Sequence, residues 1–158
     1  MRFFDWFDRL LVGLLYIVLV FLVGITFLQV VMRYFFNHPL TWAEELIGVV
    51  MIYFVLIGAA WGVRKSIHIS MEIFAKWIFG KKAIIPVIIE ISLYGILAIF
   101  MIFYGKDIVE LTRFQILPAT GLKAADAYFA LIVSGVIMLI FVLERFIYLF
   151  LRRGEIRR

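Results

Sequence analysis

Few residues in this sequence have side chains that could perform chemistry, and the two histidines are the first to consider. His38 and His68 are the only histidines, and there is no cysteine among the 158 residues. A membrane-bound haem needs histidines that face one another within helices, and a metal ion needs several ligand side chains close together. His38 and His68 fall in different connections between apolar segments. We therefore expect no haem, no other cofactor and no metal site.

Glu90 is the clear case of an acidic residue well inside an apolar segment. A buried carboxylate in such a segment needs a partner, and Arg64 and Arg145 are the candidates. Two interpretations remain open, a proton or ion relay and a structural ion pair. We favour the ion pair, because one acid without a second polar group at its depth makes a poor pathway.

A second charged group lies where the first two apolar segments meet. Arg33 ends the first segment, and Glu44 and Glu45 open the second, just after Thr41. The spacing from Thr41 to Glu44 matches a capping box, and acids at a helix N-terminus are favoured by the helix dipole. We expect Arg33 to pair with Glu45 while Glu44 serves the cap. This group is either a clamp for the first helical hairpin, which we favour, or a docking surface for another subunit.

Small residues recur along the second apolar segment. Gly58 and Gly62 have the GxxxG spacing, and Gly48, Val55 and Ala59 extend the same stripe. Such residues let membrane helices approach closely, so the pattern predicts close packing without identifying the partner. The sequence contains no nucleophile with a base and an orienting group, and no phosphate-binding loop. We therefore expect a helper subunit and not an enzyme.

Long apolar helices must position all of these residues. The sequence is 66% hydrophobic with a mean hydropathy of +1.10, whereas soluble domains are about half apolar. A membrane span needs about 20 apolar residues. We therefore predict an all-α integral membrane protein, a single membrane domain over residues 1–158 with four transmembrane helices. The spans are expected at about residues 10–32, 42–63, 83–104 and 127–151.

The basic residues predict how the chain is oriented. Most of the 16 Lys and Arg residues lie before the first span, between the second and third, or after the fourth. Because Lys and Arg accumulate on the cytoplasmic side of a membrane protein, we expect both termini in the cytoplasm. The net charge of +5 would also suit a nucleic-acid partner. That partner is not expected, because the charges lie at the ends of apolar runs and not on one solvated face.

Two connecting segments have patterns of their own. Residues 66–80 alternate apolar and polar side chains at helical spacing, which predicts an amphipathic segment lying on the inner membrane surface against lipid. We interpret His68 as a polar anchor in this segment. Residues 105–120 carry charges before Pro118, which predicts that the third helix projects beyond the membrane and then turns.

Two stretches, residues 33–45 and 61–69, resemble the small membrane subunit of TRAP (tripartite ATP-independent periplasmic) transporters, the DctQ-type Q component. The similarity in length and four-helix topology extends over the whole chain, whereas the motifs occupy only residues 33–69. Leu-Lys-Ala-Ala at residues 122–125 departs from the aliphatic-Pro-Trp pattern that relatives often carry there. The motifs comprise an Arg-Tyr pair, a Trp-x-Glu-Glu and an Arg-x-x-x-His, and the matching residues are Arg33, Trp42, Glu44, Glu45, Trp61, Gly62, Arg64 and His68.

The resemblance implies a bacterial inner-membrane protein with two partners. A large multi-helix membrane subunit would carry an organic acid, such as a C4-dicarboxylate, sialic acid or another sugar acid, together with sodium. A periplasmic binding protein would capture that acid. This chain would form a heterodimer with the large subunit and act as its scaffold. The stripe at Gly48, Gly58 and Gly62, together with Glu90, would lie at that interface, and Glu44, Glu45 and residues 105–126 would help dock the binding protein.

Two other functions are kept as alternatives. The chain would be an autonomous homo-oligomeric exporter or channel if Glu90 alone coupled protons to transport. It would be the membrane anchor of a respiratory enzyme if it carried haem, which the positions of His38 and His68 argue against.

Overall fold

The computed structural model describes residues 2–66 and 84–155, which form four long helices. Helix α1 runs over Arg2–Tyr34, α2 over Thr41–Ser66, α4 over Ile84–Thr112 and α5 over Ala124–Glu155. Each is long and apolar enough to cross a membrane. The prediction of an all-α protein with four transmembrane helices is confirmed. The amphipathic segment expected at residues 66–80, including His68, lies outside the described residues apart from Ser66.

Local sequence explains where the helices begin and end at the two described turns. After α1, Asn37 adopts a positive φ of 50°, which asparagine tolerates better than most residues. Pro39 follows and α2 begins at Thr41. Helix α4 has no proline or glycine after Gly105, so it continues to Thr112, past the expected end of the span at residue 104. The charged Lys106, Asp107 and Glu110 are therefore part of α4.

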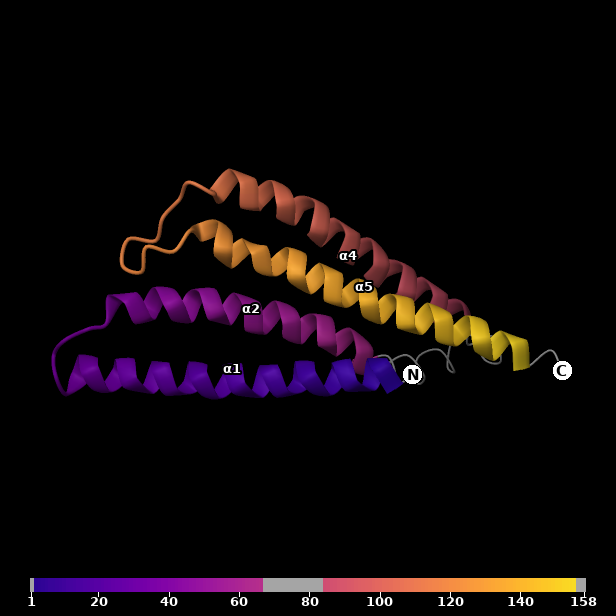
Figure 1. Cartoon of the computed structure of the whole chain (residues 1–158), viewed down its shortest axis with the longest axis horizontal. Coiled ribbons are helices and arrows are strands. Elements are labelled where there is room, and N and C mark those ends of the chain that lie inside the picture. Colours follow the sequence, from indigo (N-terminus) through magenta and orange to yellow (C-terminus); the bar gives the residue numbers. More distant parts are fainter. Residues whose placement is uncertain (1, 67–83, 156–158) are drawn as a thin grey trace.

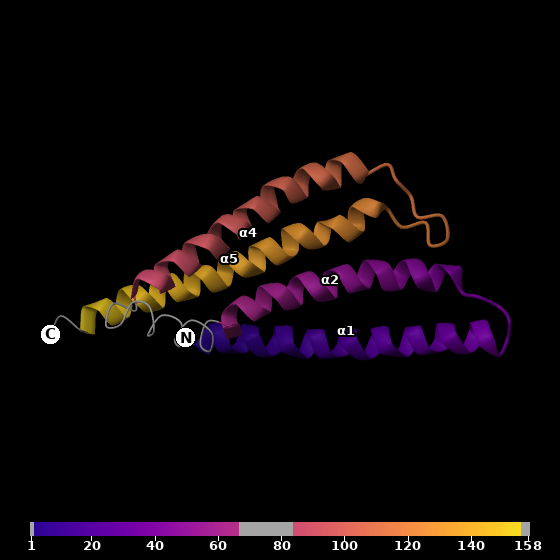
Figure 2. The ribbon, with the colours of Figure 1, turned by 180° about the vertical axis from the view of Figure 1, so that it is seen from behind.

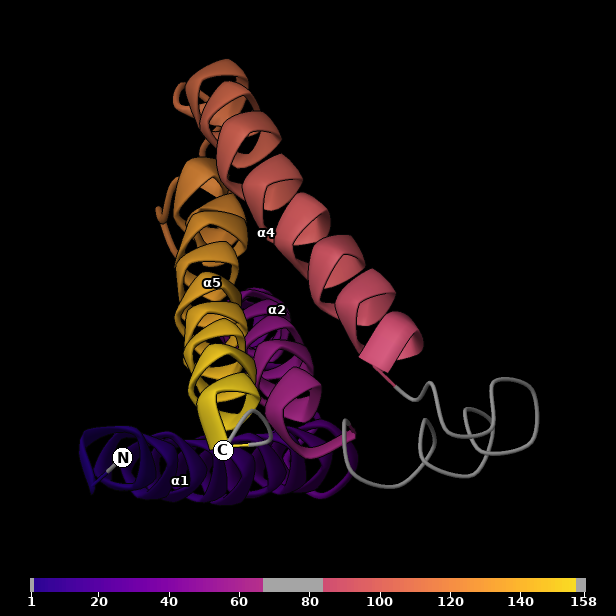
Figure 3. The same ribbon diagram turned by 90° about the vertical axis from the view of Figure 1, so that its right-hand side faces the viewer.

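The helices lie in the spatial order α4, α5, α2, α1. Helix α5 packs against both α4 and α2, and α2 also packs against α1 (Figures 1 and 2). In the view along the long axis, α1 crosses beneath α2 and α5 at an angle, while α4 lies on the other flank (Figure 3). Helix α1 begins and α5 ends at one end of the molecule, which we call the termini end. The opposite end carries the turns at residues 35–40 and 113–123, and we call it the loop end.

A small apolar core fills the space where the helices meet. Phe141 of α5 is almost fully buried and its ring lies 5.9 Å from that of Phe7 of α1, centre to centre. Most large apolar side chains of α1 and α4 point outward instead, as expected of helices whose surroundings are lipid. The core comprises Leu11, Ile57, Ala60, Val63, Ala98, Ile137, Met138 and Phe141.

The closest helix contact is between α4 and α5, and glycine makes it possible. A Cβ atom at Gly135 would lie 2.9 Å from Cγ1 of Ile102 and 3.0 Å from the carbonyl oxygen of Ala98. At Gly105 a Cβ would lie 3.1 Å from Cγ1 of Ile132. Small residues at these positions allow the two backbones to approach, as is common between membrane helices.

Candidate functional site

At the termini end, the Arg64 guanidinium group joins α1, α2 and α5. Its Nη1 lies 3.0 Å from Oδ1 of Asp8, and its Nη2 lies 3.0 Å from Oδ1 of Asp5 and 3.0 Å from Oε1 of Glu144. The Arg64 side chain is only 18% exposed. The planar guanidinium has five N–H donors and can serve several carboxylates at once. We call these four residues the Arg64 cluster.

Two aromatic residues contact the Arg64 cluster. The indole Nε1–H of Trp61 donates a 2.8 Å hydrogen bond to Oδ1 of Asp8. The Arg64 guanidinium carbon lies 5.6 Å from the centre of the Phe141 ring, within the range of a cation–π contact. Trp61 and Arg64 are one turn apart on α2, and Asp5 and Asp8 are one turn apart on α1. Their spacing therefore brings both pairs onto the facing sides of two adjacent helices.

Glu90 of α4 and Arg145 of α5 form the pair that the sequence suggested. Arg145 Nη2 lies 3.7 Å from Glu90 Oε2, whereas Arg64, the other candidate, belongs to the cluster described above. Glu90 is 9% exposed, so other residues of the chain cover most of its surface. Its expected place at a subunit interface stays a prediction. The short reach of a glutamate explains its position, since the carboxylate must find its cation within the α4–α5 contact.

At the loop end, the pairing of the acids differs from the expectation. Arg33 Nη1 lies 3.9 Å from Oε1 of Glu44, and Gln29 Nε2 donates a 2.7 Å hydrogen bond to the same oxygen. The expected pairing of Arg33 with Glu45 is therefore wrong, and the Glu44 carboxylate faces α1 instead of serving the cap. Helical geometry explains the exchange, because neighbouring positions on α2 point about 100° apart and only one of them faces α1.

The Glu45 carboxylate holds the turn between α4 and α5. It accepts hydrogen bonds from the backbone N–H of Ala119 at 3.0 Å, and from the backbone N–H and the hydroxyl of Thr120 at 2.8 Å each. The turn itself is closed by an antiparallel bridge between Ile116 and Lys123. Gly121 has a φ of +72°, a value that glycine adopts without strain. A residue of α2 thus fixes the apex of a turn that is 74 residues away in sequence.

The predicted glycine stripe of α2 makes no close contact with the described residues of the chain. A Cβ atom at Gly48, Gly58 or Gly62 would meet no atom of the described residues within 4 Å. Gly48, Val55 and Ala59 lie on an exposed face of α2. Trp42, in the first turn of α2, is also exposed. The glycines that do pack closely, Gly105 and Gly135, were not singled out from the sequence.

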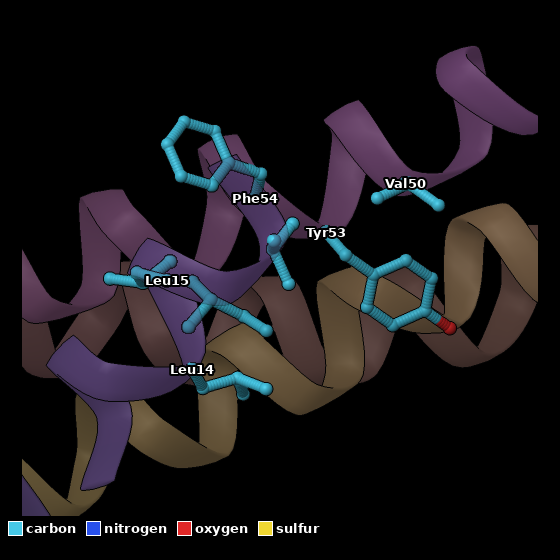
Figure 4. A pocket seen from close by; sticks show the side chains of 7 residues that line it. Leu14, Leu15, Val50, Tyr53 and Phe54 are labelled. Carbon is cyan, nitrogen blue, oxygen red and sulfur yellow. The ribbon is translucent and has the colours of Figure 1, made fainter. Parts of the chain in front are cut away.

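Between α1 and α2 there is an apolar hollow of about 260 Å³. The Tyr53 ring lines it, but the hydroxyl points away from Leu14 and Leu15 (Figure 4) and donates a 2.6 Å hydrogen bond to the carbonyl oxygen of Asp126. Without a donor or a cation, the hollow offers nothing to hold an organic anion. Its seven lining residues are Leu14, Leu15, Val18, Val50, Tyr53, Phe54 and Ile57.

Within residues 2–66 and 84–155, no three His, Asp or Glu side chains group closely enough to hold a metal ion. The polar groups instead connect elements of the fold: the other groups join side chains from two or three helices, and Glu45 joins α2 to the turn between α4 and α5. The sequence prediction missed Asp5, Asp8, Glu144 and Gln29 as members of these clusters. One signal for the first two was available, because they repeat at a spacing of one turn at the start of an apolar helix.

Comparison with known proteins identifies the family. The family model for "Tripartite ATP-independent periplasmic transporters, DctQ component" matches residues 22–152. A Haemophilus influenzae protein named as a TRAP transporter small permease is 26% identical over 136 residues, covering 86% of this chain and 82% of that protein. The Vibrio cholerae sialic acid TRAP transporter small permease protein SiaQ is 25% identical over 118 residues, covering 74% of this chain and 68% of that protein.

A second Vibrio cholerae protein matches over a shorter region. The C4-dicarboxylate TRAP transporter small permease protein DctQ is 39% identical over 49 residues, covering 31% of this chain and 21% of that protein. The family match spans most of the chain, including residues from all four long apolar helices. This chain therefore belongs to the DctQ component family of the TRAP transporters.

Proposed function

We propose that this chain is the small, non-catalytic inner-membrane subunit of a TRAP transporter that imports an organic acid, with sodium as the driving ion. The family match carries this proposal. Two of the relatives are named for different substrates, sialic acid and C4-dicarboxylates. Transporters for these different substrates have related small subunits. This is best explained if the substrate binds to the other subunits.

The apolar lining of the hollow between α1 and α2 supports that division of labour. The hollow between α1 and α2 is apolar, and Glu90 is already paired with Arg145. An organic anion needs cations or N–H donors in its site. The chain is therefore a scaffold that holds the large membrane subunit, with lipid covering its remaining apolar surface.

The orientation follows from the distribution of charge. Among the described Lys and Arg residues, more lie toward the termini end than toward the loop end. The first group comprises Arg2, Arg9, Arg64, Lys65, Arg145, Arg152 and Arg153, and the second comprises Arg33, Lys106, Arg113 and Lys123. By the positive-inside rule, the termini end lies in the cytoplasm and the loop end faces the periplasm. The loop end is then the side from which a periplasmic binding protein delivers its substrate.

The exposed face of α2 is the surface proposed for the large subunit. Gly48 and Ala59 lie on this face beside the exposed apolar side chains of Met51, Ile52 and Val55. A Cβ atom at Gly48, Gly58 or Gly62 meets nothing within 4 Å among the described residues. Another membrane helix could approach such a face closely and gain van der Waals contacts there. Within the chain itself, the α4–α5 contact is built on the same principle at Gly105 and Gly135.

Reconstitution into proteoliposomes with an imposed sodium gradient tests the proposal. The chain alone, the large subunit alone, and the two together with the binding protein are compared for uptake of sialic acid and of a C4-dicarboxylate. We expect uptake only from the complete set. Uptake by this chain alone would contradict the scaffold function and favour the autonomous transporter, with Glu90 as the residue to examine next.

A further inference from the structure

Helix α5 has two opposite charges at adjacent positions, and each faces a different neighbour. Glu144 lies 3.0 Å from Arg64 of α2. Arg145 lies 3.7 Å from Glu90 of α4. Adjacent positions of a helix point about 100° apart, so α5 directs its acid towards α2 and its base towards α4. At most 19% of each of these four side chains is exposed. Each charge therefore depends on its partner more than on water.

Helix α4 has no such pair of charges in its apolar part. Glu90 is the only charged residue between residues 84 and 105. If α4 lay between α2 and α5, this short carboxylate would have to serve both Arg64 and Arg145, and Glu144 would be left without a cation. A carboxylate without a partner is costly inside a membrane. With α5 in the middle, Glu90 and Glu144 each have an arginine.

Apolar packing alone does not determine which helix of the second hairpin contacts α2. The side chains of Ile88, Leu93 and Ile96 are exposed on α4, and apolar side chains of this kind could also pack on α2. Apolar contact between membrane helices gains little over contact with lipid. The close contacts at Gly105 and Gly135 join α4 to α5, so they would exist in either arrangement. The charges therefore carry the distinction between the two helices.

We propose that the adjacent charges of Glu144 and Arg145 determine that α5, and not α4, packs against the α1–α2 hairpin. The selection works by exclusion, because the alternative arrangement leaves a carboxylate unpaired. The hydroxyl of Tyr53 also bonds to α5, at the carbonyl oxygen of Asp126. That bond joins neutral groups and is weaker than a contact between charges. The two ion pairs thus specify the helix order more than they add to stability.

Cross-linking of the full chain in the membrane distinguishes the two arrangements, because the chain has no cysteine. Ala60→Cys with Ile137→Cys reports α5 on α2, since both residues belong to the apolar core. Ala60→Cys with Leu93→Cys reports α4 on α2. Ala60 lies one turn before Arg64 and Leu93 lies one turn after Glu90, so the two would be level if Glu90 paired with Arg64. With the native charges, only the first pair should cross-link.

The decisive variant is Glu144→Gln with Arg145→Gln, which removes both charges from α5 and leaves Arg64 as the candidate partner for Glu90. We expect the ratio of the 60–93 product to the 60–137 product to rise about tenfold, as one partly buried ion pair ceases to favour α5. Adding Glu90→Gln removes the competing acid and should restore the native pattern. The matched control, Lys106→Gln with Asp107→Asn, removes adjacent opposite charges from the far end of α4 and should resemble the wild type.

An unchanged cross-linking pattern in Glu144→Gln with Arg145→Gln would overturn the proposal, because other contacts would then fix the helix order. If this double variant is degraded in the cell, the triple variant with Glu90→Gln decides the question. A triple variant that accumulates and gives the native cross-link supports the proposal, since the damage then came from Glu90 without a partner. A triple variant degraded to the same extent would overturn it, because the charges would then serve stability alone.

Discussion

At the scale of single residues, Arg64 connects more of the molecule than any other described side chain. It reaches Asp5 and Asp8 on α1 and Glu144 on α5 while lying over the Phe141 ring. A lysine ammonium is a compact charge and does not have the planar fork of N–H groups that this arrangement uses. Three carboxylates around one cation would repel one another if that cation were removed.

The first prediction concerns this cluster. Arg64→Gln should lower the free energy of unfolding by about 2–4 kcal/mol, because it leaves partly buried carboxylates without a cation. The thermal midpoint of the detergent-solubilised chain, followed by size-exclusion chromatography, measures the effect. Adding Asp8→Asn and Glu144→Gln to the same variant should restore part of the loss. Equal destabilisation by Arg64→Gln and by Arg33→Gln would contradict the prediction, since the Arg33 pair is exposed and 3.9 Å apart.

At the scale of elements, the α4–α5 pair forms a tightly packed unit. Gly135 faces Ile102 and Ala98 at distances that leave no room for a Cβ atom. The α1–α2 pair is different, because it is joined by polar contacts at both ends and has an apolar hollow between them. Close packing at glycine therefore distinguishes the α4–α5 pair, which also has the Glu90–Arg145 ion pair, whereas hydrogen bonds at both ends distinguish the α1–α2 pair.

The second prediction tests the packing of α4 against α5. Gly135→Ala should destabilise the chain by about 1–3 kcal/mol, because the added methyl group would have to displace Ile102 or the backbone at Ala98. Gly24→Ala is the control. A Cβ atom at Gly24 meets nothing within 4 Å, and alanine favours a helix more than glycine does. The thermal midpoints of the two variants should therefore move in opposite directions.

At the scale of the whole molecule, the four helices form an extended arrangement in which α1 and α4 lie on opposite flanks (Figure 3). Helix α2 packs against α1 and α5 yet keeps one apolar face uncovered, with Gly48 and Ala59 among its exposed residues. A subunit of this shape buries little of its apolar surface by itself. It suits a role in which a larger membrane partner covers one face and lipid covers the others.

The third prediction tests that uncovered face. Gly48→Leu should leave the thermal midpoint of the isolated chain nearly unchanged, because a Cβ atom there contacts nothing within the described residues. It should reduce co-purification with the large subunit about tenfold, since a leucine would keep another helix at a distance. Gly24→Leu on α1 should have little effect on assembly. If both variants assembled normally, the interface would have to be sought on another helix.

The helices could be predicted from the sequence more completely than the contacts between them. Spans follow from apolar runs of membrane length, and the Glu90–Arg145 pair was one of two suggested partnerships. The exchange of roles between Glu44 and Glu45 depends on which side of α2 faces α1, and the sequence does not determine this rotation. Likewise, Gly135 becomes important only because Ile102 and Ala98 of α4 lie opposite it.

The two ends of the molecule are each fastened by a contact between residues far apart in sequence. Glu144 meets Arg64 at the termini end, and Glu45 meets Thr120 at the loop end, with separations of 80 and 75 residues. Contacts inside the first hairpin, such as Gln29 with Glu44, span only 15 residues. During synthesis the α1–α2 hairpin can therefore pair before α5 has been made. Glu45 and Arg64 can acquire these distant partners only after the second hairpin has been made, when α2 can also pack against α5.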